Sequence, residues 1–279
     1  MNYELLKARI WMWGPFILAG LLFLLTLYFV IPILTSTSGG EEPVETGYTR
    51  QSLAEVTASR VNLRRAYLAA HGGEELLAGL HSSRARGVLE TSAGLVSFVS
   101  IKKRPGQSAL MLRFPNHEQK FVVDGDVVWQ RISAPQQKPV VNRLEGSEGQ
   151  QVRHLGAFFD PVMALLLENE GTIHGIETAF SEDGTMIIVD FESEAFDLRS
   201  TAFINASTLR LASRVDALAS GKERTFFYLD YQSANGVFVP FVVESYLDGE
   251  FENRVSIEQI EFNLGIFPAT FQLPPELAN

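Results

Sequence analysis

The chain has 279 residues, a formal net charge of −10 at pH 7, a pI of about 5.1 and no cysteine. The lack of cysteine excludes disulfides, thiolate metal ligands, cysteine nucleophiles and anchoring through a lipid-modified cysteine. The excess of acidic residues repels phosphate backbones, so we expect no nucleic-acid partner. With 46% hydrophobic residues, the chain has room for one large domain besides a membrane anchor and a linker.

The N-terminal part contains a long apolar segment, residues 11–34, which reads WMWGPFILAGLLFLLTLYFVIPIL and carries no charge. As a helix rising about 1.5 Å per residue, it spans about 36 Å, more than the roughly 30 Å hydrocarbon layer of a bilayer. Basic residues precede the segment and glutamates follow it. The positive-inside rule therefore predicts a single-pass anchor, with residues 1–10 in the cytoplasm and the rest of the chain on the other side of the membrane.

A cleaved signal peptide is the alternative, because the small residues at 35–39 (TSTSG) suit a peptidase site. Signal peptides, however, have apolar cores of about 7–15 residues, much shorter than this segment. We therefore predict a transmembrane anchor at 11–34, a polar linker at 35–49 and one domain at 50–279.

The domain is predicted to begin with a helix at residues 51–70, followed by a short helical segment at 74–80. Gly72 and Gly73 end the first helix, because glycine readily takes the backbone conformation that stops a helix. Apolar residues at three- and four-residue steps form one face of the first helix. This face either belongs to the core or closes a cavity as a lid, and the sequence leaves both open. Its apolar residues are Leu53, Val56, Leu63 and Tyr67.

Alternating apolar and polar residues, separated by turns rich in Gly, Asp and Asn, predict about a dozen strands in the rest of the domain. A helical stretch at 147–170, broken at Asp160-Pro161, interrupts them. Because strands do not alternate with helices, the fold is predicted to be mainly β (α+β): a large curled antiparallel sheet, or open half-barrel, with helices across its concave face. The strands are expected at 84–90, 94–103, 107–114, 119–123, 127–132, 172–180, 185–192, 197–205, 209–217, 223–231, 237–247 and 252–262.

Several passages together resemble a known family. They are AYLAAHGG (66–73), LHSSRARG (80–87), YQSANGVFVP (231–240), the strand at 257–263 and the closing segment at 267–274. Over roughly residues 53–274, this layout resembles the outer-membrane lipoprotein-sorting (LolA/LolB-like) superfamily. The resemblance implies a half-barrel in the bacterial periplasm whose apolar cavity accepts the acyl chains of lipoproteins or other lipids. The predicted anchor and the lack of cysteine depart from the sorting proteins and imply a variant fixed to the inner membrane.

Two sets of apolar residues are candidates for the wall of such a cavity, one on the helical stretch and one on a facing strand. The same residues would also fill an ordinary core between a helix and a sheet, so both interpretations stay open. The helical set is Leu155, Phe158, Phe159, Met163 and Leu166; the strand set is Ile187, Val189 and Phe191; Met111 and Trp129 are further wall candidates.

The sequence contains no pattern that indicates catalysis, a metal or a cofactor. Its five histidines do not pair at the i, i+4 spacing of a helical zinc site, and it has no HExxH, GxSxG, P-loop or GxGxxG motif. We therefore predict a non-enzymatic binding domain whose partners are the membrane and a lipid or acylated protein. The alternative is a periplasmic interaction or sensory module in an envelope complex. An enzyme such as a hydrolase would need a Ser, a His and a carboxylate that converge.

Overall fold

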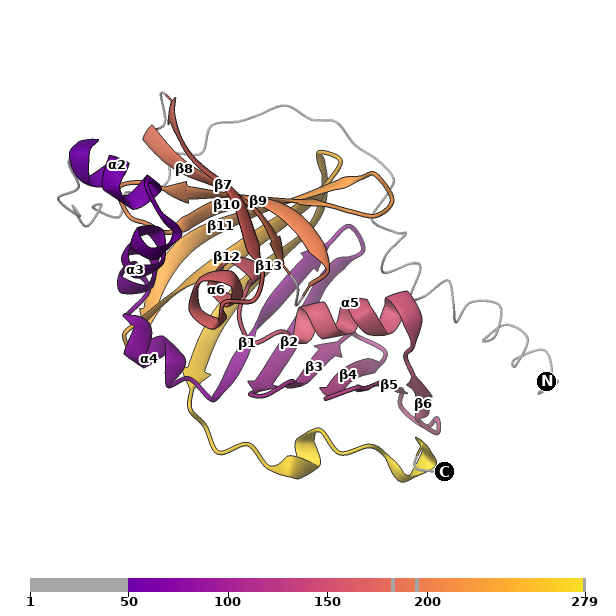
Figure 1. The fold of residues 1–279 in the computed structure, drawn as a ribbon. Coiled ribbons are helices and arrows are strands. Elements are labelled where there is room, and N and C mark those ends of the chain that lie inside the picture. Colours follow the sequence, from indigo (N-terminus) through magenta and orange to yellow (C-terminus); the bar gives the residue numbers. More distant parts are fainter. Residues whose placement is uncertain (1–49, 182–183, 194–195, 278–279) are drawn as a thin grey trace.

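The computed structural model describes residues 50–181, 184–193 and 196–277; the predicted cytoplasmic segment, anchor and linker lie outside these ranges. In the ranges described, no helix combines the length and the apolar character needed to cross a bilayer. The described chain is a mainly β domain, as the sequence predicts, with thirteen strands in one antiparallel sheet and few helices (Figure 1).

The strands follow one another across the sheet in the order β6-β5-β4-β3-β2-β1-β13-β12-β11-β10-β9-β8-β7. Of these neighbours, β1 and β13 are the pair that joins segments distant in the sequence. The strands are β1 (Ser82–Thr91), β2 (Gly94–Lys103), β3 (Gln107–Arg113), β4 (Glu118–Asp124), β5 (Val127–Ser133), β6 (Val140–Arg143), β7 (Thr172–Ser181), β8 (Gly184–Ser193), β9 (Leu198–Asn205), β10 (Leu211–Ala217), β11 (Glu223–Ala234), β12 (Val237–Leu247) and β13 (Glu250–Phe262).

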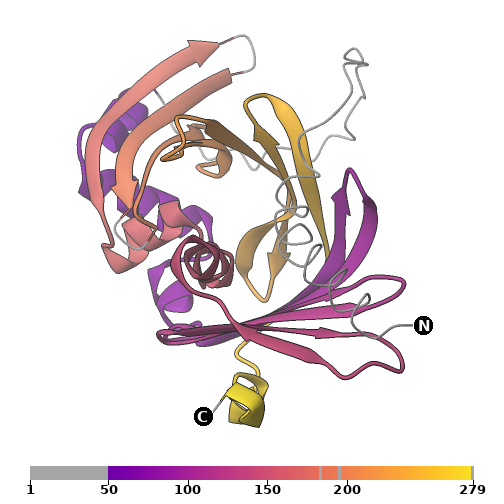
Figure 2. The same ribbon diagram turned by 90° about the vertical axis from the view of Figure 1, so that its right-hand side faces the viewer.

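Short helices precede the sheet and interrupt it between β6 and β7. Figure 2 shows the sheet curled around α5, and Figure 1 shows the C-terminal segment on the other side of the β1–β6 strands. The sheet is thus an open half-barrel with helices across its concave face. The helices are α2 (Arg50–Thr57), α3 (Arg60–Ala70), α4 (Glu74–Ala78), α5 (Gly146–Gly156), α6 (Pro161–Met163) and the π-helical turn η1 (Ala164–Glu168); the C-terminal segment contains the 3-10 turns η2 (Pro268–Thr270) and η3 (Pro275–Leu277).

The helix expected at 51–70 is divided in two, into α2 and α3. Ser59 is the reason, because its hydroxyl accepts a hydrogen bond from the backbone N–H of Asn62 (3.3 Å) and so begins a new helix. At the other end, Gly72 and Gly73 have φ values of 118° and 96° and end α3 as predicted. The prediction of one continuous first helix is therefore wrong, whereas its C-terminal end is confirmed.

The helical stretch expected at 147–170 breaks earlier than predicted, after Gly156, where Ala157 takes an extended conformation. The predicted break at Asp160-Pro161 also occurs: the Asp160 carboxylate accepts hydrogen bonds from the N–H groups of Val162 and Met163 (2.8 and 3.1 Å) and begins α6. The sequence prediction missed β6, a four-residue strand.

The concave face of the sheet is covered by several helices at one end and by a single helix at the other. In the region that we call the filled half (residues 50–80 and 157–247), α3, α6 and η1 pack on β7–β12 and form the largest hydrophobic core. In the region that we call the thin half (residues 82–156), α5 alone lies over the concave face of β3–β5, beside a smaller cluster of Val96, Phe98 and Leu112. Strand β13 joins the two halves by pairing with β1 and β12.

Four of the five passages that carry the family resemblance lie next to one another in space, whereas the closing segment at 267–274 packs against β3–β5. The N–H of Phe238 donates a hydrogen bond to the carbonyl of His71 (3.2 Å), and the N–H of Asn263 donates to the carbonyl of Ser82 (2.8 Å). The end of α3, the start of β1, the β11–β12 hairpin and the end of β13 therefore meet at one corner of the sheet.

Candidate functional site

Most of the predicted wall residues meet in the core of the filled half. The side chains on β8 face those on α6 and η1, and each is at most 6% exposed. Phe158 and Phe159 pack at the edge of this core, with their rings edge to face and their centroids 4.9 Å apart. This burial is typical of a packed core. The buried residues are Met163, Leu166, Ile187, Val189 and Phe191.

The predicted lid residues belong to the same core. Leu63 and Tyr67 of α3 are 0% and 1% exposed, and Val56 of α2 is also buried, whereas the side chain of Leu53 lies outside the described part. Exposing a buried side chain of this size to water costs about 1.5–3 kcal/mol. Opening α3 as a lid would therefore cost several kcal/mol before any ligand is bound.

Leu155 does not lie with the other helical candidates, which corrects its assignment to the same set. It lies on α5 and is 66% exposed, whereas Met163 and Leu166 follow the extended break at 157–160 and point into the core. The break rotates the two parts of the stretch relative to each other. Leu155 consequently belongs to the thin half.

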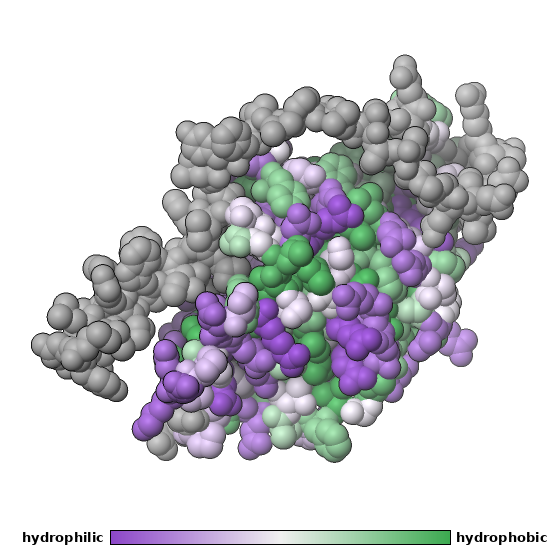
Figure 3. All heavy atoms as spheres, turned by 180° about the vertical axis from the view of Figure 1, so that it is seen from behind, coloured by the Kyte–Doolittle hydropathy of each residue, from purple (hydrophilic) through white to green (hydrophobic). Residues whose placement is uncertain are grey.

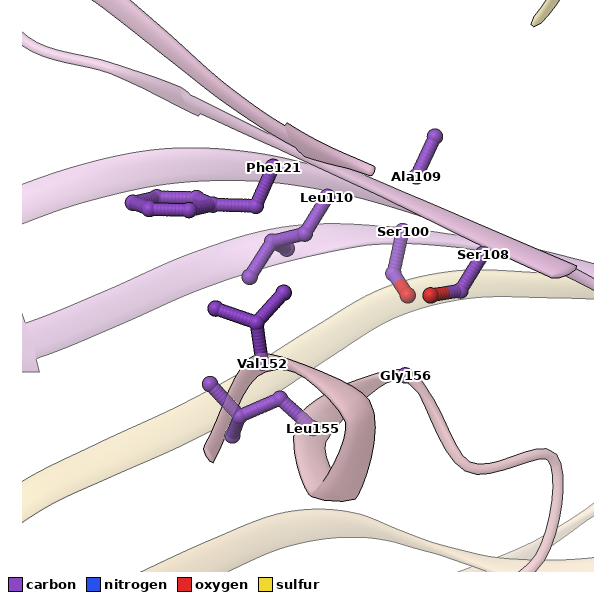
Figure 4. A pocket seen from close by; sticks show the side chains of 8 residues that line it. All are labelled: Ser100, Ser108, Ala109, Leu110, Phe121, Val152, Leu155 and Gly156. Carbon is purple, nitrogen blue, oxygen red and sulfur yellow. The ribbon is translucent and has the colours of Figure 1, made fainter. Parts of the chain in front are cut away.

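A small cavity lies between α5 and the concave face of β2–β4 (Figure 4). Its volume is about 10 Å³, which is room for about one water molecule. Figure 4 shows Val152 of α5 directed toward the strands that carry Leu110 and Phe121, Leu155 at the side of the cavity, and two serine hydroxyls at the Gly156 end. The cavity is thus apolar at one end and polar at the other. Its lining residues are Ser100, Ser108, Ala109, Leu110, Phe121, Val152, Leu155 and Gly156.

Few contacts hold α5 over this cavity. Lys102 donates a hydrogen bond from Nζ to the carbonyl of Ala157, and Arg153 donates one to the carbonyl of Asp126. Val152 is the α5 side chain that packs against the apolar cluster of Val123, Val128 and Leu144. Gly149 and Gly156 also bring the α5 backbone close to Leu144 and Ser108, so α5 is held by two polar contacts and by small residues rather than by large buried side chains such as those of α3.

Lys102 is an unusual part of this attachment. Burial lowers the pKa of its ammonium to about 8, although the Asp160 carboxylate opposes the shift. In the antiparallel register Lys102 pairs with Ser108, so the ammonium and the serine hydroxyls belong to the same polar end of the cavity. The thin half therefore has a cationic group beneath the end of α5.

Met111 and Trp129 lie on the opposite, outward face of the thin half. Trp129 packs with Ala109, Val122 and the fully buried Phe271 of the C-terminal segment. Met111 is two residues from Ala109 on β3 and points to the same face. The structure thus separates these two candidates from the concave cavity and places them under the C-terminal segment.

A buried polar cluster in the filled half has no counterpart in the sequence prediction. Arg214 and Asp216 on β10 form a bidentate ion pair (2.7 and 2.8 Å), and the hydroxyl of Ser200 on β9 donates to Asp216 (2.7 Å). All three side chains are buried. The alternation of side chains along β10 could have revealed this cluster. Arg214 and Asp216 lie two residues apart and so share the inward face, opposite the buried Ala202 and Ser200 of β9.

A related cluster lies on the neighbouring strands. Arg224 of β11 pairs with Glu252 of β13 (2.8 Å), and the hydroxyl of Ser245 on β12 donates to the same carboxylate (3.1 Å). In both clusters the serine donates directly to a carboxylate whose cation is an arginine. This arrangement has no histidine to take the proton of the serine, as a hydrolase of the Ser-His-Asp type would require.

Three tyrosines of the filled half are buried within reach of the charge of Asp160. Burial raises the pKa values of Tyr67, Tyr228 and Tyr231, and the nearby Asp160 carboxylate raises them further. Tyr231 donates its hydroxyl to the carbonyl of Leu211 (3.0 Å). The segment 157–160 therefore lies where both halves of the concave face meet, because Ala157 accepts the hydrogen bond of Lys102 from the thin half and Asp160 begins α6 in the filled half.

The outward face is also partly apolar. Figure 3 shows apolar residues gathered among charged ones on the side opposite to the view of Figure 1. On β11 and β13 the exposed residues include Phe227, Leu229 and Phe251. Among the residues with a described position, no three His, Cys, Asp or Glu side chains group closely enough to hold a metal ion.

Sequence comparison identifies no relative: no family model matches the chain, and no curated protein matches it. The fold, in contrast, matches solved structures. A LolA superfamily protein from Nitrosomonas europaea matches with a TM-score of 0.50 and 13% identity, over 81% of this chain and 98% of that chain. A DUF1329 family protein from Desulfovibrio piger matches with a TM-score of 0.52 and 11% identity, over 77% of this chain and 98% of that chain. The resemblance to the LolA superfamily is therefore confirmed at the level of the fold.

Proposed function

We propose that this chain is a membrane-anchored extracytoplasmic domain that binds an acyl chain, of a lipid or an acylated protein, between α5 and the concave face of the thin half, without catalysing a reaction. The observation that carries the proposal is the thin half itself. There a sheet face that carries Leu110, Leu112 and Phe121 beside polar residues is covered by one helix, with a small cavity already beneath it.

The energetics favour this half as the place of binding. A ligand needs more room than about 10 Å³, so α5 must move away from β2–β4. That movement breaks the hydrogen bonds of Lys102 and Arg153 and exposes Val152 together with the apolar cluster it covers, which in all costs several kcal/mol. An acyl chain of about a dozen methylenes gains about 0.8 kcal/mol for each buried CH₂, which exceeds this cost.

The apolar segment at 11–34 supports a location beside a bilayer. The linker at 35–49 spans at most about 50 Å when extended, so an anchored domain stays close to the lipids. This tether raises the local concentration of the cavity near its ligand. With the positive charges before the segment, we place the domain in the periplasm of a bacterium, on the inner membrane.

A photoactivatable fatty acid tests the proposal on the full chain in its membrane. After irradiation, mass spectrometry of the digested protein locates the labelled residues. We expect labels on α5 and on β2–β4, including Leu110 and Phe121, and few on Ile187 or Phe191 in the filled half. Labels confined to residues 11–34 would show that the chain contacts lipid only through its anchor.

A pair of matched variants makes the test specific. Leu110→Trp fills the cavity and should reduce labelling of α5 at least fivefold. Leu229→Trp makes the same kind of change on an exposed position of β11 and should leave the labelling unchanged. Equal labelling in both variants would rule out binding beneath α5.

A further inference from the structure

The two edges of the open sheet are protected to different degrees. Strand β6 has four residues and lies against η3, where Arg143 donates a hydrogen bond to the carbonyl of Leu277 (3.1 Å). Strand β7 has ten residues and ends the strand order on the other side. In the part of the chain that the structure describes, no backbone hydrogen bond joins 172–179 to a segment other than β8. Such an edge offers a row of N–H and C=O groups to an added strand.

An open groove runs beside the first half of β7. Its volume is about 390 Å³, and it lies between β7 and the junction of α2 and α3. Figure 1 shows α2 beside the β7–β8 end of the sheet. The groove is therefore bounded by a helix junction on one side and by the strand edge on the other. It is lined by residues 57–60, including Arg60, and by residues 172–176 of β7, including Ile173 and Ile176.

The side chains in the groove favour a particular kind of strand. A β-bulge at His174 turns both Ile173 and Ile176 toward the main core, where each is only partly buried. These two side chains form an apolar floor. Because alternate residues of an extended chain point to the same side, a bound strand would place every second side chain on this floor.

Arg60 supplies a charge at the rim of the groove. Its guanidinium donates to two neutral acceptors, the carbonyl of Leu165 (3.2 Å) and Oδ1 of Asn169 (2.7 Å). It takes part in none of the ion pairs found among the described residues. A guanidinium with neutral partners is complementary to a carboxylate, with which it forms a stronger hydrogen bond.

We propose that the groove beside β7 binds an extended, acidic segment of a partner protein, which adds a strand to the sheet edge and places a carboxylate on Arg60. Backbone hydrogen bonds to β7 would supply affinity; the apolar floor and Arg60 would supply specificity. This site is separate from the cavity beneath α5, so the domain could hold a partner protein and a hydrophobic ligand at the same time.

Two synthetic peptides test the proposal on the full chain in nanodiscs of neutral lipid. One is an eight-residue peptide of alternating valine and threonine with a single glutamate, and the other has lysine in place of the glutamate. We expect the acidic peptide to bind at least tenfold more tightly by fluorescence polarisation. Its binding should slow hydrogen exchange in residues 172–179 and leave residues 140–143 of β6 unchanged.

Charge reversal provides the decisive control. Arg60→Glu should weaken binding of the acidic peptide at least tenfold and strengthen binding of the lysine peptide. Arg65→Glu makes the same charge change on an exposed position of α3 and should alter both affinities less than twofold. Equal effects of the two variants would overturn the role of Arg60. The amides of 172–179 that point away from β8 should exchange fast before any peptide is added, because the others are already bonded to β8. Slow exchange of these outward amides would show that another part of this chain covers the edge, and would also overturn the proposal.

Discussion

The two halves of the sheet share antiparallel pairing but differ in what covers their concave faces. In the filled half, α3, α6 and η1 bury large side chains such as Leu63, Tyr67 and Leu166. In the thin half, α5 contributes Val152 to a small cluster and leaves Leu155 exposed. The comparison shows that a helix on a concave sheet is not by itself a lid. The amount of apolar surface beneath the helix decides whether it can move.

The largest expected effect concerns the buried ion pair of the filled half. Arg214→Met leaves Asp216 buried without its cation and should lower the free energy of unfolding by about 3–5 kcal/mol. The double variant Arg214→Met with Asp216→Leu removes both charges and should recover most of that loss. Denaturant unfolding of the full chain in mild detergent, followed by circular dichroism, measures both. Additive losses in the double variant would mean that the two charges do not depend on each other.

A slightly smaller loss of unfolding free energy is expected when a side chain in the apolar core of the same half is truncated. Leu63→Ala creates a cavity at a fully buried position and should destabilise the domain by about 2–5 kcal/mol. The same unfolding measurement applies. Photolabelling by the fatty acid should stay on α5 in this variant under conditions where it remains folded. Increased labelling of α3 instead would identify α3 as the movable cover and reverse our assignment of the two halves.

The attachment of α5 should depend on pH through Lys102. Its pKa is about 8 in the folded chain and 10.5 when it is not buried, so between these values the unfolded chain binds more protons. The contribution of Lys102 to stability therefore rises as the pH increases from about 8 to 10.5, by up to about 3 kcal/mol. Comparison of wild type with Lys102→Met at about pH 7 and pH 10.5 isolates this change. A constant difference between them would show that the ammonium is solvated and does not hold α5 through a buried contact.

The smallest effect on stability is expected at Leu155. Because its side chain is mostly exposed, Leu155→Ala should change the free energy of unfolding by less than about 0.5 kcal/mol. The same variant removes an apolar group at the mouth of the proposed site and should reduce fatty-acid labelling about twofold to fivefold. A stability loss above about 1 kcal/mol would place Leu155 in the core and remove the difference between the halves.

Most strands could be predicted from the sequence because their turns are marked by residues with special backbone preferences. Asn235 with Gly236 and Asp248 with Gly249 all have positive φ values, and each pair joins two strands at the expected place. Strand β6 was missed because it is short and mostly exposed, so it shows little alternation between apolar and polar residues. Local sequence patterns thus predict most strands in their order along the chain but miss a short, exposed strand at the edge of the sheet.

The candidate site was only partly predictable, since it depends on how distant segments pack. Ile187, Val189 and Phe191 were expected on one face and do share it, but the sequence could not show that helices fill the space above them. Trp129 was assigned to the same wall, whereas the C-terminal segment covers it on the other face. The Arg214–Asp216 pair was missed because charged residues on strands are usually exposed.

The position of β13 has a consequence for the order of folding. Every other neighbouring pair of strands is consecutive in the sequence, so β1–β6 and β7–β13 can each form from local hairpins. The seam between β1 and β13 must instead bring together residues 82–91 and 250–262, and closing so long a loop costs entropy that hairpins avoid. Among the strands of this sheet, the last to be synthesised is therefore the one that joins the two sets of hairpins, and until it pairs with β1 no strand pairing links them.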